Sequence, residues 1–430
     1  MTANQRPRSA PDDRELRLWK AGWALAVTFA AAVLAAGSVF YSLVVLLDIR
    51  EIDSTAKLDA STLVDLVKLS FGVVAGAGAL VALVVAYRRQ RVDEAGAHRE
   101  ATRLHAERFT AAVSQLGDNS PAVRLGGVHA LVSLADDAPD HSLRQTCIDV
   151  LCAYVQLPYP PDPGDDPACQ DEHHRYLALR KIRHTILRLI GDRYRRPETI
   201  HGSWQGFDLD LTDVTIDGDM NFTGAVFSGG TVSFTGAVFS GGTVSFDTAS
   251  FCGGTVSFDR ASFRGSTVSF SGAKCWVGEM SFRDALFSGG AVHFVDASFS
   301  GPGRLFSGLK VSFRGAVFSG GEVSFVNAQF VGCAESFVHT VFSGGTVHFS
   351  STDFHGGKGF FRHAEFSGGR VSFDRTSFFG RESFVGTVFS GGEVSFSEAK
   401  GSAPDGLLVA VGTPVPATVT LPPTWLLPNP

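Results

Sequence analysis

The sequence predicts a chain of the α + β-solenoid class, with two transmembrane helices, a small α-helical domain and a repetitive β-solenoid in that order. Three observations predict this. Two long runs without charge precede residue 90, apolar residues recur with helical spacing between residues 92 and 200, and phenylalanine then recurs at alternating steps of five and seven residues. Most of the 36 phenylalanines and 48 glycines follow residue 200, so the C-terminal half has its own architecture.

These patterns divide the chain into seven segments. The segments are an N-terminal tail (1–20), a first transmembrane helix (21–47), a loop (48–68), a second transmembrane helix (69–87), a helical domain or spacer (88–200), the solenoid (204–400) and a proline-rich tail or C-terminal cap (401–430). Both apolar runs exceed the roughly 18 residues that mark a membrane span. A cleaved signal peptide is the alternative for the first run, but the run is too long and lacks a clear cleavage site.

The charges beside the two runs predict their orientation. Arginine and lysine precede the first run and follow the second, whereas the connecting loop is richer in aspartate and glutamate. By the positive-inside rule, both termini face the cytoplasm, which predicts a multi-pass plasma-membrane protein with the lipid bilayer as a partner. The six cysteines show neither a paired framework nor a CxxC spacing, and reduced thiols fit a cytosolic location.

Residues 92–200 read as a set of helices. Ser120-Pro121 gives an N-cap followed by proline at the first helical position. A later helix carries an apolar stripe beside basic residues, and this stripe either rests on anionic lipid or, more commonly, faces a core. The stripe consists of Leu179, Ile182, Ile186 and Leu189. Cys169, His173 and His174 lack the ligand number and spacing of a structural zinc site, so we expect no metal there.

The repeat predicts the fold of the C-terminal half. A small or branched apolar residue stands two positions before each phenylalanine, and an in-out-in triplet of this kind is a very short strand. Glycine and serine between the triplets supply tight corners. One such unit cannot bury its own phenylalanine, so the units must stack into a solenoid. The first predicted core residues are Phe227, Phe234, Phe239, Phe246, Phe251, Phe258, Phe263 and Phe270.

Units such as AVFSG, ASFRG and ALFSG resemble the pentapeptide repeat family, and the chain as a whole resembles a bacterial, membrane-linked group of such proteins. The resemblance covers residues 207–399 and implies a right-handed, four-sided β-helix. Every second corner here has two extra residues, as in SGGT. This leaves open whether a turn takes about 24 residues in four faces or about 12 in two, and the width that paired phenylalanines need favours four.

Two further features concern the ends and irregularities of the array. Cys275 replaces a phenylalanine, and the stretch FSGPGRLFSGLKVSF spaces Phe299, Phe306 and Phe313 by seven twice, which predicts a bulge in one coil. The opening stretch FDLDLTDVTIDGDMNF resembles degenerate first coils. The tail from Gly401 either caps the last coil or stays free and disordered.

We expect a non-catalytic protein without a cofactor, because no unlike polar groups converge in a cleft as an enzyme needs. The leading hypothesis is a membrane-anchored scaffold whose cytoplasmic solenoid binds a protein partner; homo-oligomer formation stays open. The outward serines are most simply solvated strand faces, and the candidate binding row takes in two histidines of later units. That row is Ser233, Ser245, Ser257, Ser269, Ser281, His293 and His348.

The sequence favours three other functions less. Some pentapeptide-repeat proteins resemble DNA and bind type II topoisomerases, but residues 207–400 hold 18 acidic and 13 basic residues, which is too weakly acidic for a DNA mimic. The net charge of −6 and the lack of a basic stripe also argue against a nucleic-acid partner. A surface or adhesion module would need the reversed topology, and a short loop at 48–68 offers little for signalling across a membrane.

Overall fold

The computed structural model describes residues 60–158, 160–164, 169–300, 309–333, 336–381 and 383–426, together with isolated positions between 27 and 41. The chain divides into two units, residues 1–101 and 102–430, and each is described by itself. The predicted N-terminal tail (1–20), the loop up to residue 59 and, apart from those isolated positions, the predicted first span (21–47) lie outside the described residues.

The predicted second span (69–87) is corrected by the structure. These residues belong to helix α2 (Ala60–Leu116), which is 57 residues long and continues without a break into the charged stretch from Arg88 onward. A bilayer crossing needs about 20 consecutive, mostly apolar residues. No helix in the described part of the chain meets this need for length together with apolar character. The finding contradicts the predicted span and, with it, the predicted multi-pass location in the plasma membrane.

In the described residues, three helices lie between α2 and the solenoid. They are α3 (Pro121–Asp136), α4 (His141–Gln156) and α5 (Gln170–Tyr194). Helix α3 begins at the predicted proline and lies so close to the end of α2 that a Cβ at Gly127 would be 2.6 Å from the backbone nitrogen of Leu116. Ile182, Ile186 and Leu189 of α5 are buried, so the basic helix turns its apolar stripe toward a core rather than toward lipid.

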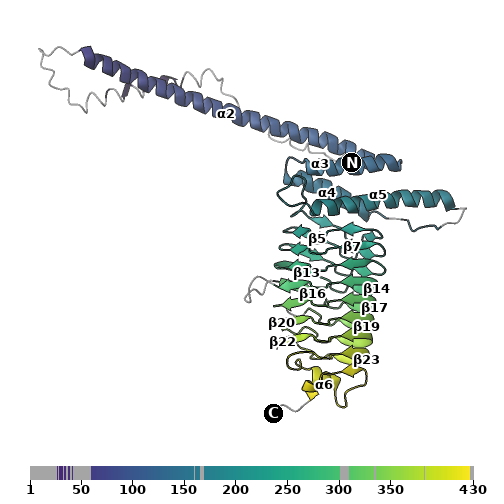
Figure 1. The fold of residues 1–430 in the computed structure, drawn as a ribbon. Coiled ribbons are helices and arrows are strands. Elements are labelled where there is room, and N and C mark those ends of the chain that lie inside the picture. Colours follow the sequence, from purple (N-terminus) through teal and green to yellow (C-terminus); the bar gives the residue numbers. More distant parts are fainter. Residues whose placement is uncertain are drawn as a thin grey trace, which may run out of the picture. The chain divides into compact units, whose positions relative to one another are not determined.

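The solenoid consists of short parallel strands stacked along one axis (Figure 1). Val232 pairs with Val256 and Val238 with Ser262, so one turn takes 24 residues. Each early turn contains four strands, such as the turn that runs from Val226 to Ser245. The four-faced coil is therefore confirmed over the two-faced alternative, and about eight turns are stacked. The right-handed sense that the resemblance implies stays a prediction.

The strands in the described part of the solenoid form three sheets. The five-stranded sheet contains β1 (Leu209–Asp210), β5 (Thr231–Ser233), β9 (Thr255–Ser257), β13 (Gly278–Ser281) and β16 (Leu309–Ser312). The seven-stranded sheet contains β4 (Val226–Phe227), β8 (Ser250–Phe251), β12 (Lys274–Cys275), β15 (Ser298–Ser300), β18 (Gln329–Val331), β20 (Asp353–Lys358) and β22 (Ser377–Arg381).

The twelve-stranded sheet covers the remaining two faces. Its first strands are β2 (Thr215–Ile216), β3 (Met220–Asn221), β6 (Val238–Phe239), β7 (Thr243–Ser245), β10 (Ser262–Phe263) and β11 (Thr267–Ser269). In later turns the two faces join into single eight-residue strands that bulge at the glycine pairs. These are β14 (Leu286–His293), β17 (Val317–Ser324), β19 (Val341–His348), β21 (Glu365–Ser372) and β23 (Val388–Ser395), and β24 (Val419–Thr420) completes the sheet.

Columns of phenylalanine fill the interior. Phe258 stacks on Phe234 and Phe282 with ring centroids 4.9 and 4.8 Å apart, and its ring meets Phe246 edge-on at 5.8 Å. Stacking along the axis and edge-to-face contact across it are both favourable arrangements of aromatic rings. All eight predicted core phenylalanines are buried. The copied sequence thus keeps like rings in register.

The short corners confirm the predicted turn chemistry and add to it. The Ala237 amide donates to the Phe234 carbonyl at 3.0 Å, and Gly236 between them has φ 69°. Glycine reaches this left-handed region without strain. The equivalent positions of other coils hold non-glycine residues in the same conformation, for example Thr248 at φ 54° and Arg260 at φ 56°. The fold therefore imposes the corner even where the residue disfavours it.

The predicted bulge and the predicted tail both have structural counterparts. Leu286 pairs with Val317 and Ser298 with Gln329, so this turn takes 31 residues, seven more than the 24-residue turns, and the extra length falls around residues 301–308, outside the described part. The tail is a cap. It contains α6 (Leu407–Val411), β24 and α7 (Pro423–Leu426). The ring centroid of Trp425 lies 6.1 Å from that of Phe378 and 5.9 Å from that of Phe396.

Candidate functional site

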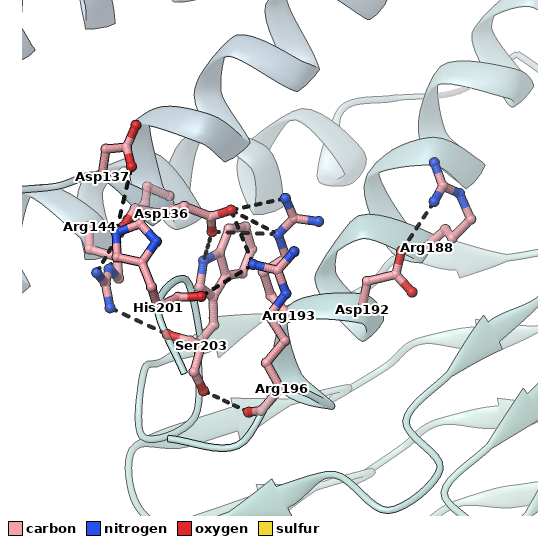
Figure 2. A network of polar contacts seen from close by, with 11 residues as sticks. Asp136, Asp137, Arg144, Arg188, Asp192, Arg193, Arg196, His201 and Ser203 are labelled. Carbon is pink, nitrogen blue, oxygen red and sulfur yellow. Dashed lines mark hydrogen bonds and ion pairs between the residues drawn. The ribbon is translucent and has the colours of Figure 1, made fainter. Parts of the chain in front are cut away.

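A polar network joins the helices to the first coil of the solenoid (Figure 2). Asp136, the last residue of α3, is 8% exposed and accepts hydrogen bonds from Arg193 of α5 at 2.9 Å and from the indole of Trp204 at 3.1 Å. Arg144 of α4 donates to the backbone carbonyls of Ala135, Asp136 and Ser203. Because Asp136 and Trp204 are buried and the arginines are partly buried, the contact stabilises one arrangement of three helices against the first coil.

Helix α4 satisfies the open edge of the first strand. The side-chain nitrogen of Gln145 donates to the backbone carbonyl of Asp208 at 2.9 Å. The side-chain oxygen of Gln145 accepts a hydrogen bond from the backbone nitrogen of Asp208 at 3.0 Å. Gln156 donates to the Asp210 carbonyl at 3.1 Å. An unpaired strand edge invites pairing with another chain, and here glutamine side chains take the place of the missing coil.

Helix α5 is clamped to the first coil through Asp217. Arg180 Nε lies 2.7 Å from Oδ2 of this carboxylate, and His184 Nε2 lies 2.7 Å from Oδ1. Burial raises the pKa of Asp217, but the hydrogen bonds from His184 and Arg180 outweigh it and lower the pKa to about 2. Arg180 and His184 of α5 thus hold one carboxylate of the first coil between them, and we call this contact the clamp.

The predicted binding row is divided between two faces. Ser233, Ser257 and Ser281 pair from coil to coil on the five-stranded sheet, because successive 12-residue units occupy different faces of a 24-residue turn. Ser245, Ser269 and His293 pair on the twelve-stranded sheet, and the same row continues through Ser324 to His348; these residues form the second row.

The serine hydroxyls bind neighbouring coils. Thr235 Oγ1 lies 2.9 Å from Ser257 Oγ, and Asp247 accepts a hydrogen bond from Ser269. These serines are half-buried, and Ser281 is buried and donates to Asp259. The rows thus help to hold adjacent coils together. A role for them in binding a partner stays a prediction.

The short corners carry charge of opposite sign on opposite halves of the turn. We call one the basic corner: it comprises residues 259–260, 283–284, 314–315, 338–339 and 362–363, with four arginines against two aspartates. Half a turn away along the chain is the acidic corner, which comprises residues 247–248, 271–272, 295–296, 326–327, 350–351, 374–375 and 397–398. It has four carboxylates against Arg375, which pairs with Glu398 at 3.6 Å.

Sequence reasoning missed this segregation. In the sequence, the arginines are scattered among acidic residues at no obvious period. Only the 24-residue register, with one longer turn, places Arg283 next to Arg314: the Asp284 amide donates to the Arg314 carbonyl at 3.0 Å. Sorting the charged residues by position within the 24-residue unit would have revealed the two corners.

The cysteines and histidines give no metal centre in the described residues, where no three histidine, cysteine or acidic groups gather as ligands. Cys169 occupies the N-cap position of α5 without a side-chain capping hydrogen bond, and His173 Nδ1 lies 3.0 Å from Asp162 Oδ1. Burial raises the pKa of the Cys275 and Cys333 thiols to about 12, which disfavours the reactive thiolate.

Comparisons with protein families, with curated proteins and with solved structures found no match to this chain. The parallel solenoid with its regular phenylalanine spacing is consistent with a fold of the pentapeptide-repeat type.

Proposed function

We propose that the solenoid, as a pentapeptide-repeat-type array, is a non-catalytic scaffold that presents a rigid surface to a protein partner. The contrast between a uniform interior and a varied exterior supports this. Interior positions repeat the same phenylalanine from coil to coil, whereas exposed corner positions change residue and sort into a basic and an acidic edge. Repeat arrays of this kind use their outer surface for binding.

The closed ends strengthen the proposal. Helix α4 covers the first strand through Gln145 and Gln156, and Trp425 packs against the last coil, so both ends of the solenoid are in contact with other parts of the chain. A partner would therefore bind along the sides. The DNA-mimic alternative needs an evenly acidic surface, and the basic corner does not fit it.

Site-specific photo-crosslinking tests the proposal. A photoreactive side chain would replace one outward residue at a time, at Ser245, Lys274, Arg314 and Ser319 on the solenoid and at Asp149 on α4, in cells that produce the chain. We expect a discrete protein adduct from at least one solenoid position. Adducts from Asp149 alone, or none above background, would overturn the scaffold function.

A further inference from the structure

The basic corner lies beside a row of aliphatic side chains. Leu286 pairs with Val317, and Val317 with Val341, on neighbouring strands β14, β17 and β19. All three point outward and are half-buried, so part of each remains in contact with solvent. Each follows a corner by two or three residues, since Arg283 precedes Leu286 and Arg314 precedes Val317. A basic edge and an aliphatic row therefore run side by side along the axis.

Backbone hydrogen bonds from coil to coil keep the corner in register. Arg260, Arg283 and Arg314 lie on successive coils, and Arg362 lies two coils beyond Arg314, past Val338 and His339. The Arg260 amide donates to the Arg283 carbonyl at 2.7 Å, and the His339 amide donates to the Arg362 carbonyl at 3.0 Å. Arg260, Arg283, Arg314 and Arg362 are all exposed. With strands about 4.8 Å apart, the edge from Arg260 to Arg362 is about 19 Å long.

Four acidic residues in the described part of the chain lie near this edge, and some of them are bound to neighbouring groups of the solenoid. Asp259 accepts hydrogen bonds from the Ser281 hydroxyl and the Arg283 amide of the next coil. Glu279 lies 3.9 Å from Arg283, a distant and exposed pair. Asp284 lies over Gly315, and Glu365 limits the aliphatic row at its C-terminal end. The basic corner itself holds four arginines against two aspartates, and Glu279 and Glu365 beside it bring the number of carboxylates to four, so the arginines are exposed but the whole edge carries no net charge.

We propose that the basic corner and the aliphatic row bind an extended protein segment in which acidic and aliphatic side chains alternate. Successive side chains of an extended segment point to opposite sides. A strand that lies between the two rows would direct its carboxylates toward the arginines and its aliphatic side chains toward Leu286, Val317 and Val341. At about 3.3 Å per residue, some six residues span the edge. This proposal rests on the scaffold function and names the partner's chemistry.

Charge complementarity favours a protein segment over a nucleic acid. A nucleic acid would gain from the arginines but not from the aliphatic row, and the acidic corner half a turn away would repel a longer polyanion. An acidic–aliphatic segment uses both rows at once.

The test measures binding of a fluorescein-labelled hexapeptide of alternating glutamate and valine to the full chain by fluorescence anisotropy. The double variant Arg283→Glu/Arg314→Glu should weaken binding about tenfold or more, because two attractive contacts become repulsive. Aspartate already occupies the equivalent corner position at residue 259, so the fold accepts an acid there. The matched control Lys274→Glu/Lys400→Glu makes the same change in net charge on other exposed positions and should change binding less than about twofold.

A second variant separates the aliphatic row from charge. Val317→Ser/Val341→Ser should weaken binding of the alternating peptide several-fold and leave the weaker binding of a hexaglutamate peptide unchanged. Serine stands at the equivalent position 262, so this variant keeps a side chain that the fold already contains. If the arginine double variant and the lysine double variant lost the same amount of peptide affinity, the proposal would be overturned. Tighter binding of a twelve-residue thymidine oligonucleotide than of the peptide would also overturn it.

The crosslinking experiment distinguishes failure of this site from failure of the scaffold function. Arg314 belongs to the basic corner, and the exposed Ser319 follows Val317 of the aliphatic row by two residues on β17. Adducts from Lys274 or Ser245 but not from Arg314 or Ser319 would overturn the proposed site while leaving the scaffold function intact.

Discussion

The solenoid and the helical joint at its first coil are stabilised in opposite ways. Inside the solenoid, each contact is a copy of the contact one turn earlier, as in the column through Phe234, Phe258 and Phe282. At the joint, each contact is unique and polar, and Asp136 binds Arg193 and Trp204, which lie 57 and 68 residues away in sequence. Repetition distributes stability over many equal contacts, whereas the joint concentrates it in a few unlike ones.

The largest effect is expected in the solenoid interior. Phe258→Ala should lower the free energy of unfolding by about 3–5 kcal/mol, because the ring is fully buried between two stacked neighbours and a cavity would remain. Denaturant unfolding of the purified chain measures this. The control Phe379→Ala removes a ring that is 51% exposed and should cost less than about 1 kcal/mol. Similar losses for both would show that the columns are not the core.

A smaller but local effect is expected at the joint. Asp136→Ala should lower the free energy of unfolding by about 3 kcal/mol, because Arg193, whose side chain is only 14% exposed, would keep a largely buried charge without its partner. The control Asp192→Ala breaks ion pairs to Arg188 and Arg195, which are more exposed, and should cost under about 1 kcal/mol. Hydrogen exchange should speed up in α3 and α5 and not in β14–β23. Uniform acceleration along the solenoid would contradict the separation of the two regions.

How far the sequence predicted these regions follows from the same difference. Copies of one contact leave a period in the sequence, so the strands, the core phenylalanines and the bulge near Phe299 could all be predicted. Asp136 and Trp204 leave no such period, because their partners are set by how α3, α5 and the first coil meet. The predicted span at 69–87 was wrong, since an apolar run says nothing about the charged residues into which helix α2 continues. The opposite charges of the two corners became apparent only with the 24-residue register.

The clamp at Asp217 predicts a dependence on pH. Its pKa is lowered from the ordinary 3.8 to about 2 in the folded state, so its contribution is present above pH 3.8 and is lost as the pH falls through about 2. Asp217→Asn should therefore cost about 1 kcal/mol at pH 6. The difference in the free energy of unfolding between the unchanged chain and the Asp217→Asn variant should shrink between pH 4 and pH 2. A difference that is constant with pH would show that the carboxylate charge is not what holds α5.

The smallest effect concerns the corners, where the strain of the repeat is found. Thr248 is β-branched and has φ 54°. Thr248→Gly should raise the free energy of unfolding by about 0.5–1 kcal/mol, because relief of the left-handed strain exceeds the extra freedom of glycine in the unfolded chain. Thermal unfolding would show this gain as a rise in melting temperature. The reverse change Gly236→Thr, at the equivalent corner, should lower the melting temperature. A destabilised Thr248→Gly chain would mean that the threonine side chain stabilises the corner.

The 24-residue register underlies the columns, the two corners and the proposed binding edge, and disulfide trapping tests it directly. Neighbouring strands place the Cα atoms of Ser233 and Ser257 opposite each other, within the range that a disulfide bridges. In a chain with Cys169 and Cys252 changed to serine, the pair Ser233→Cys/Ser257→Cys should oxidise readily, whereas Ser233→Cys/Ser245→Cys, on different faces, should not. Ready oxidation of the second pair and not of the first would contradict the account, because it would make the turn 12 residues long.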